Sequence, residues 1–301
     1  IAAKEWPVAI RALEKFRKQY PMEQRWKQGV AEKLALAYSS QNMPVKAAQE
    51  MMLLVGMIPQ EQRQEMLWQA ANLYDQDNES NEAITVYKTY VKQYPQPLSR
   101  SIELRHKIAQ FYRSKSDTAQ LHSWLKSIVD AESDADAGQR TERTNYLAAT
   151  ALLEIIKPGY KAYTEAKLTT PLKLSLKKKK QLMKQSIESY KKAAQFQVAE
   201  VTTAATYQIA EIYREFAKAI LKSERPKKLN EEELEEYNYL LEDQAFPFEE
   251  KALDIHQTNI KKIADGIYDD SIKNSLKALG EMMPFRYAKI EVVDEYVEAN
   301  P

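Results

Sequence analysis

Small and hydrophobic residues recur at fixed distances before and after two tyrosines, Tyr38 and Tyr74, in the first half of the chain. Leu34 and Ala35 precede the first tyrosine by the same steps at which Ala70 and Ala71 precede the second. The following offsets of 9, 13, 16 and 21 residues fall on Ala47, Met51, Leu54 and Pro59 after Tyr38, and on Ala83, Tyr87, Tyr90 and Pro95 after Tyr74. Because the two tyrosines are 36 residues apart, the pattern predicts two copies of one structural unit.

Each copy has the pattern of two helices joined by a turn. Residues three, four and seven apart share one face of an α-helix, and Leu34, Ala35 and Tyr38 have this spacing. The spacing returns after a short polar stretch, and a proline, which cannot continue a helix, closes each copy. We therefore predict helix–turn–helix repeats over about 28–61 and 64–97.

Two incomplete copies flank these repeats. A third copy is predicted over about 102–135. Ile108, Ala109 and Tyr112 carry its first-helix pattern, but the closing proline is missing. Residues 1–21 show the spacing of a second helix alone, which is half a repeat. We therefore expect the regular region to span 1–137 and more repeats to precede it in the native protein.

The helical pattern continues over 138–301, but the fixed period is lost. We predict longer, divergent helix pairs that continue the repeat array and form its C-terminal end, where atypical sequence covers the exposed core of the last repeat. Pro158 is expected to end one helix before a long connection, and Pro247 to interrupt another. Asn230, three residues before Glu233, is typical of a capping box at a helix start.

The spacing in the first half resembles the tetratricopeptide repeat, a helix–turn–helix unit of about 34 residues. The resemblance implies an all-α fold, a right-handed α-solenoid whose first helices line a concave groove for a protein or peptide segment. The family's groove positions correspond here to Glu32, Leu36, Ser39 and Ser40, to Trp68, Asn72, Asp75 and Gln76, and to His106, Gln110, Arg113 and Ser114. Glu32 and Leu36 depart from the pattern of family members that clamp a C-terminal carboxylate, so an extended or helical segment is the expected partner.

A second resemblance concerns the C-terminal part. The stretches 241–252, 265–269 and 284–289 look like the end of large bacterial tetratricopeptide proteins associated with envelope machinery of the Tol/Ton or gliding-motility kind. This likeness implies a periplasmic protein that works in a cell-envelope complex. A cytoplasmic location is the alternative, because the absence of cysteine fits either compartment.

Composition argues against three classes of function: nucleic-acid binding, cysteine chemistry and membrane spanning. Lys plus Arg total 44 and Asp plus Glu total 43, so the formal net charge is +1 and the cation surplus typical of nucleic-acid binding is missing. Without cysteine there is no disulfide or thiolate chemistry. No apolar run reaches the roughly 20 residues of a membrane span, so none is predicted.

No residues with catalytic or metal-binding spacing stand out. None of His106, His122 and His256 has the paired spacing of a helical zinc site, and no glycine cluster is present to hold a phosphate. We therefore predict no catalytic residue, cofactor or metal. The run Lys177–Lys180 allows a patch for an anionic partner, but a solvated helix face is favoured. Trp26 and the other tryptophans are expected in the core, apart from Trp68 in the groove.

Three functions remain open. A protein-interaction scaffold or adaptor leads, because stacked repeats expose long surfaces suited to partners. Self-assembly into a homo-oligomer is the second, because the exposed half repeat leaves apolar surface uncovered. An enzyme hidden in 138–301 is the least favoured, and it would require a pocket that gathers carboxylates or a histidine with strongly shifted pKa values.

Overall fold

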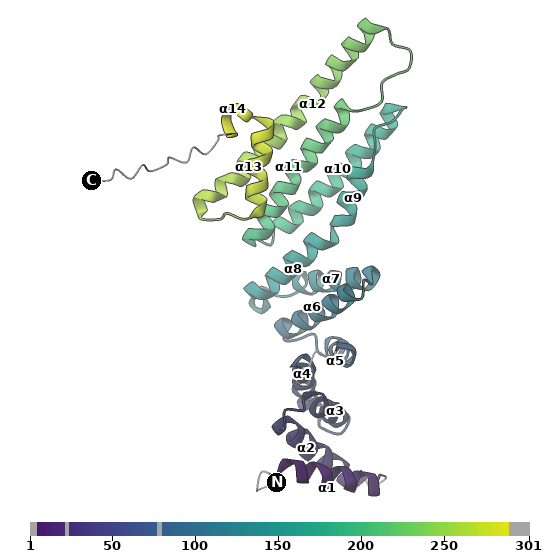
Figure 1. The fold of residues 1–301 in the computed structure, drawn as a ribbon, viewed down its shortest axis with the longest axis vertical. Coiled ribbons are helices and arrows are strands. Elements are labelled where there is room, and N and C mark those ends of the chain that lie inside the picture. The colour runs from purple at the N-terminus through teal and green to yellow at the C-terminus, as the bar shows by residue number, and fades with distance from the viewer. Residues whose placement is uncertain (1–4, 22–23, 77–79, 289–301) are drawn as a thin grey trace, which may run out of the picture. The chain divides into compact units, whose positions relative to one another are not determined.

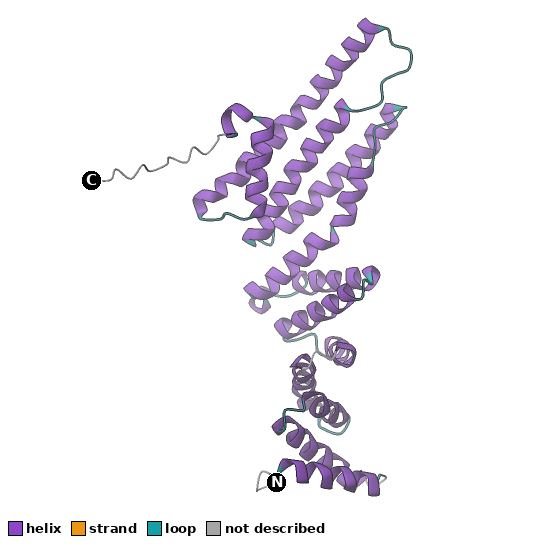
Figure 2. Ribbon diagram, in the orientation of Figure 1, coloured by secondary structure: helices purple, strands orange, loops and turns teal. Residues whose placement is uncertain are grey.

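The computed structural model describes residues 5–21, 24–76 and 80–288, and every regular element in these ranges is a helix (Figures 1 and 2). In chain order they are α1 (Trp6–Gln19), α2 (Gln24–Ser40), α3 (Pro44–Val55), α4 (Gln60–Gln76), α5 (Ser80–Gln93), α6 (Leu98–Ser114), α7 (Thr118–Ser133), the 3-10 turn η1 (Ala137–Gln139), α8 (Glu142–Ile155), α9 (Lys157–Glu165), α10 (Leu172–Ala194), α11 (Ala199–Leu221), α12 (Glu231–Ile260), the 3-10 turn η2 (Lys261–Asp265), α13 (Asp270–Met282) and α14 (Pro284–Tyr287). The predicted all-α class is confirmed. None of these helices combines the length and apolarity that a bilayer span requires.

Contacts divide the chain into two compact units, Ile1–Leu147 and Ala148–Pro301. In the first unit, each helix from α1 to α7 packs against the next one in sequence. The residues predicted to face inward are buried: Leu34 and Ala47 are 0% exposed and Tyr38 is 4% exposed. The repeat spacing therefore predicts the core of this unit correctly. The boundary predicted at residue 137 marks where the repeat period ends, and the compact unit continues to Leu147.

The second unit is built around α11, which packs on α10, α12 and α13. Phe216 in α11 is fully buried, and its ring centroid lies 4.7 Å from that of Phe248 in α12. The buried Tyr163 hydroxyl in α9 donates to the Ile212 carbonyl at 2.6 Å. Long-range packing and a hydrogen bond therefore hold these longer helices together.

The two prolines behave differently from the sequence prediction. Pro158 does not open a long connection: α9 begins at Lys157, and Pro158 occupies its first turn, where a backbone N–H is not needed. Pro247 lies inside the continuous helix α12. An interior proline costs about 3 kcal/mol, and the burial of Leu241, Ala245 and Ala252 on both sides of it offsets that cost.

The start of α12 confirms the capping-box prediction. The Asn230 side chain accepts from the Glu233 backbone at 2.8 Å, and the Glu233 carboxylate accepts from the Asn230 backbone at 2.9 Å. Two N–H groups that lack helical partners are thereby satisfied. The first turn of α12 is therefore fixed in place although its side chains are exposed.

One lysine of the run Lys177–Lys180 departs from the expected solvated face. Lys179 is 1% exposed, and its ammonium donates to the carbonyls of Tyr163 at 3.2 Å and Ala166 at 2.8 Å. These carbonyls lie at the end of α9, where a cation is favoured by the helix dipole. Lys179 thus joins α9 to α10, while its three neighbours remain exposed.

Candidate functional site

Four of the predicted groove positions line one hollow in the first unit. This hollow has a volume of about 450 Å³ and lies among α4, α5, α6 and the start of α8. It contains the predicted Asp75, His106 and Gln110, and Ser114 of the same groove series. Its other lining residues are Tyr74, Ala83, Ile84, Tyr87, Glu103, Lys107, Phe111 and Arg143. We call it the polar hollow.

Asp75 connects three helices at the centre of the polar hollow. Its carboxylate accepts hydrogen bonds from the Tyr87 hydroxyl in α5 and from the Lys107 ammonium in α6. Burial, together with the hydrogen bond to Asp75, raises the pKa of Tyr87 above its usual range, so this phenol remains a donor. Asp75 therefore fixes the position of Lys107 beside the space a ligand would enter.

The other charged pair of the polar hollow joins α6 to α8. The Arg143 guanidinium donates to the Glu103 carboxylate at 2.7 and 3.4 Å, and this pairing raises the pKa of Arg143. In the same lining, the Gln110 amide nitrogen lies 2.7 Å from the His106 ring nitrogen. The hollow therefore presents charged groups, an amide and an imidazole ring, which suit a polar peptide backbone better than an apolar ligand.

The remaining predicted residues whose side chains the structure describes do not line this hollow. Glu32 is exposed and accepts from Gln28 at 2.9 Å, and Leu36 is 55% exposed. Trp68 is half-buried, with Arg100 lying 4.8 Å above its ring and Tyr90 at 6.1 Å. Asn72 is half-buried and Arg113 is exposed, and the side chain of Gln76 lies outside the described residues.

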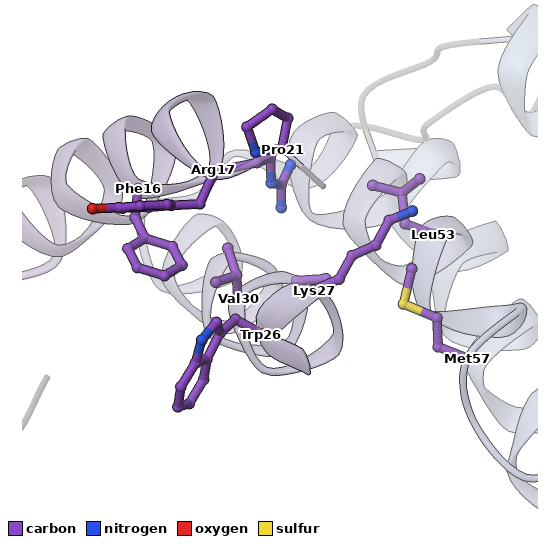
Figure 3. A pocket seen from close by; sticks show the side chains of 10 residues that line it. Phe16, Arg17, Pro21, Trp26, Lys27, Val30, Leu53 and Met57 are labelled. Carbon is purple, nitrogen blue, oxygen red and sulfur yellow. The ribbon is translucent and has the colours of Figure 1, made fainter. Parts of the chain in front are cut away.

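Sequence reasoning missed a second, apolar hollow of about 270 Å³ in the first unit (Figure 3). Side chains of α1, α2 and α3 line it, namely Phe16, Arg17, Trp26, Lys27, Val30, Ala31 and Leu53, together with Tyr20, Pro21 and Met57 from the adjoining turns. Trp26 is 49% exposed here instead of lying in the core. The close spacing of Phe16, Tyr20 and Trp26 around Pro21 is the sequence signal that could have indicated this surface.

A Ser–His–Glu arrangement occurs in the second unit, but it is buried. His256 lies 3.2 Å from the Ser275 hydroxyl and 3.1 Å from the Glu211 carboxylate. His256 and Ser275 are both 0% exposed, and Asn259 also donates to the Ser275 oxygen. Since a substrate has no access to this hydroxyl in the structure, the arrangement is better explained as a polar network that joins α11, α12 and α13.

Metal binding has no support in the described ranges, where no three histidine, aspartate or glutamate side chains gather as a metal ion requires. The polar hollow and the apolar hollow of the first unit are therefore the surfaces on which a function can be argued.

Comparisons with known proteins do not extend this description. A scan against protein-family models finds no match, and a search of the curated proteins finds none either. One solved structure, described as "Computational Design of Self-Assembling Cyclic Protein Homooligomers", aligns over 92% of this chain and 90% of its own length, with 14% identity and a TM-score of 0.27. A likeness this low carries no argument about fold or function.

Proposed function

We propose that this protein is an interaction scaffold that binds an extended segment of a partner protein in the polar hollow of its first unit. One observation carries the proposal. Asp75, His106 and Gln110, which come from two successive repeats, line one concave surface. A peptide backbone offers N–H and C=O groups along its whole length, and the donors and acceptors of this surface complement them.

The apolar hollow supports the same function. Affinity in protein interfaces is concentrated in a few buried aromatic or bulky anchors, surrounded by polar contacts. The surface around Trp26, Tyr20 and Leu53, each nearly half exposed, offers a place for such an anchor from the partner. In this proposal the polar hollow orients the partner segment, and the apolar hollow adds binding free energy.

The wider setting is also a proposal. Stacking of the first-unit helices as a right-handed tetratricopeptide-type solenoid is supported by the repeat spacing and by the packing of each helix on the next. A place in a bacterial envelope complex, in the periplasm, is supported by the likeness of residues 241–289 alone. We propose no enzymatic activity, because the buried His256 network offers no access to a substrate.

Affinity capture from the source cell, followed by mass spectrometry, tests the scaffold proposal. The parent chain is compared with a His106→Ala, Gln110→Ala variant, and with a Lys126→Ala control on the exposed surface of α7. We expect the parent and the control to capture the same partner and the double variant to lose it. A peptide from that partner should then bind the double variant roughly tenfold more weakly, or about 1.4 kcal/mol less favourably.

Equal capture by a folded double variant would remove the polar hollow from the proposal. Circular dichroism spectra that match the parent establish that the variant is folded. A partner that is lost only on Trp26→Ala substitution would place binding in the apolar hollow instead.

A further inference from the structure

The near-neutral charge of the whole chain hides a separation of charge within the second unit. Helix α10, Leu172–Ala194, contains eight lysines and one glutamate. Helix α12, Glu231–Ile260, contains ten acidic residues and one lysine. Charges collected on separate elements create complementary surfaces, even when they cancel in the total.

Four lysines of α10 form one stripe. Lys173, Lys177, Lys180 and Lys184 are spaced by four, three and four residues, all are exposed, and together they line one open hollow along the helix. No ion pair within the described part of the chain involves any of them. We call these four residues the lysine stripe.

The exposed side of the first half of α12 is acidic. Six carboxylates of this half are exposed, and helical periodicity gathers them within one arc of roughly 140° that excludes the buried Leu241 and Ala245. Two aromatic rings lie among them, Tyr239 with 64% exposure and Phe246 with 56%. The six carboxylates, which we call the acidic face, are Glu231, Glu232, Glu235, Glu236, Glu242 and Asp243.

Within one copy, these two surfaces belong to different sides of α11. Figure 1 shows α11 between α10 and α12, in agreement with the contacts of α11 with both helices. The ion pairs found in the described residues of the second unit include no member of the acidic face. Each surface is therefore left to interact with something outside its own copy.

We propose that the acidic face of one copy docks on the lysine stripe of a second copy. The two surfaces are opposite in charge and similar in length. At 1.5 Å per residue, the stripe extends over about 16 Å and the acidic face over about 18 Å. The exposed rings of Tyr239 and Phe246 provide apolar contact for the lysine stems and for Leu174, which is 66% exposed.

A second copy fits better than a nucleic acid or an anionic bilayer. Either of those partners is an extended surface of one sign, whereas the stripe contains only four lysines and the whole chain has a formal net charge of only +1. A second copy instead brings a compact acidic surface of limited length. This self-association rests on the second unit and is independent of the scaffold proposal for the first.

Sedimentation velocity of the purified full chain tests the proposal, at concentrations up to roughly 200 μM, where weak association is measurable. We expect reversible self-association that weakens at least about tenfold between low and high salt, because exposed charges are screened. Two reversal variants separate the surfaces: Lys177→Glu, Lys180→Glu changes the stripe, and Glu235→Lys, Glu242→Lys changes the acidic face. Each variant alone should be monomeric.

Mixing the two reversal variants gives a sharper result. The stripe variant keeps a native acidic face, and the face variant keeps a native lysine stripe, so their mixture should form a one-to-one complex although neither variant associates alone. Lys178→Glu is the matched control, because Lys178 is exposed on the same helix but lies off the stripe. It should associate like the parent. Circular dichroism confirms that each variant is folded.

Three outcomes would overturn the proposal. The first is a parent chain that stays monomeric over the whole concentration range. The second is association that persists in both reversal variants. The third is a mixture that remains monomeric. Vesicles containing phosphatidylserine and a duplex oligonucleotide are tested in parallel; binding lost only in the stripe variant, with a monomeric parent, would assign the stripe to an anionic partner instead.

Discussion

The two units handle buried polar groups in different ways. In the first unit, core tyrosines direct their hydroxyls toward carboxylates at the edge of the core: Tyr38 donates to Glu14 at 2.5 Å, and Tyr87 donates to Asp75. In the second unit, polar side chains bond to one another inside the core. His256 and Asn259 both contact the Ser275 hydroxyl, and all three are at most 2% exposed.

Helix length explains part of this difference. The first-unit helices α1 to α7 have 12–17 residues and pack on sequence neighbours, so contacts close in sequence determine their arrangement. In the second unit, α10 and α11 have 23 residues and α12 has 30. Long apolar helix faces allow neighbouring registers of similar energy, and a buried polar network selects one of them.

The largest expected effect comes from removing one buried ring in each unit. Phe216→Ala and Tyr90→Ala should each cost about 3–5 kcal/mol, because both side chains are fully buried and leave cavities. The number of helices that each substitution destabilises should differ. Hydrogen exchange should show lost protection across α10–α13 for Phe216→Ala, but only in α3–α6 for Tyr90→Ala, because most packing in the first unit is between helices adjacent in sequence.

Equal loss of protection throughout the first unit in Tyr90→Ala would contradict this contrast between local and extended cooperativity. Gln69→Ala, an exposed change in α4, is the control and should leave exchange unaltered.

A smaller effect should follow from breaking the polar network of the second unit. His256→Ala should lower the free energy of unfolding by about 2 kcal/mol, because the Ser275 hydroxyl and the Glu211 carboxylate lose a buried partner. Urea denaturation measures this value. A double-mutant cycle with Ser275→Ala should show that the two effects are not additive, and His122→Ala on the surface of α7 should change little.

A buried glutamate side chain in the first unit gives a prediction of the opposite sign: its replacement should raise the free energy of unfolding. Glu132 is 1% exposed, and neither carboxylate oxygen has a hydrogen-bond partner among the residues that the structure describes. Glu132→Leu should therefore stabilise the protein by about 1 kcal/mol, because a buried polar group without a partner is replaced by an apolar side chain. The matched variant Glu50→Leu should destabilise it, since Arg17 donates to Glu50 at 2.8 and 2.5 Å. A lower melting temperature for Glu132→Leu would show that this carboxylate has a partner in solution.

The same contrast explains what could be predicted from the sequence. Repeat spacing identified the first-unit core, because Leu34, Tyr38 and Ala47 follow one helical period and pack locally. It could not reveal that Lys179 is buried, since the carbonyls it caps belong to another helix. For the site, the same offsets found Asp75, His106 and Gln110 but not Lys107 or Arg143, which belong to no family position and reach the hollow only after folding.

The exposure of single aromatic residues was not predicted either. Trp26 was expected in the core and Trp68 in the groove, yet Trp26 borders a hollow and Arg100 covers the ring of Trp68. The difference depends on side chains from distant positions, here 32 residues away for Arg100. Periodicity therefore indicates which face of a helix turns inward, but not which ring remains open to a partner.

The smallest expected effect is a dependence on pH that belongs to the second unit. Burial alone would raise the pKa of Glu211, but hydrogen bonds from His256 and Arg214 and the charge of Arg214 outweigh it and hold this pKa below the ordinary value of 4.5. A carboxyl with a lower pKa in the folded state stabilises that state fully above its unfolded pKa. The stabilisation is lost as the pH falls through the folded pKa.

Unfolding free energies at about pH 7, 5, 4 and 3 measure this dependence, because each step changes the protonation of carboxyl groups. The parent should lose stability below about pH 4.5, and Glu211→Gln should lose less over the same interval, since its amide does not titrate. Gln185→Ala, an uncharged change on the exposed side of α10, should follow the parent. If Glu211→Gln also followed the parent, the acid sensitivity would belong to other carboxyl groups. The polar network would then stabilise the second unit through its hydrogen bonds and not through the charge of Glu211.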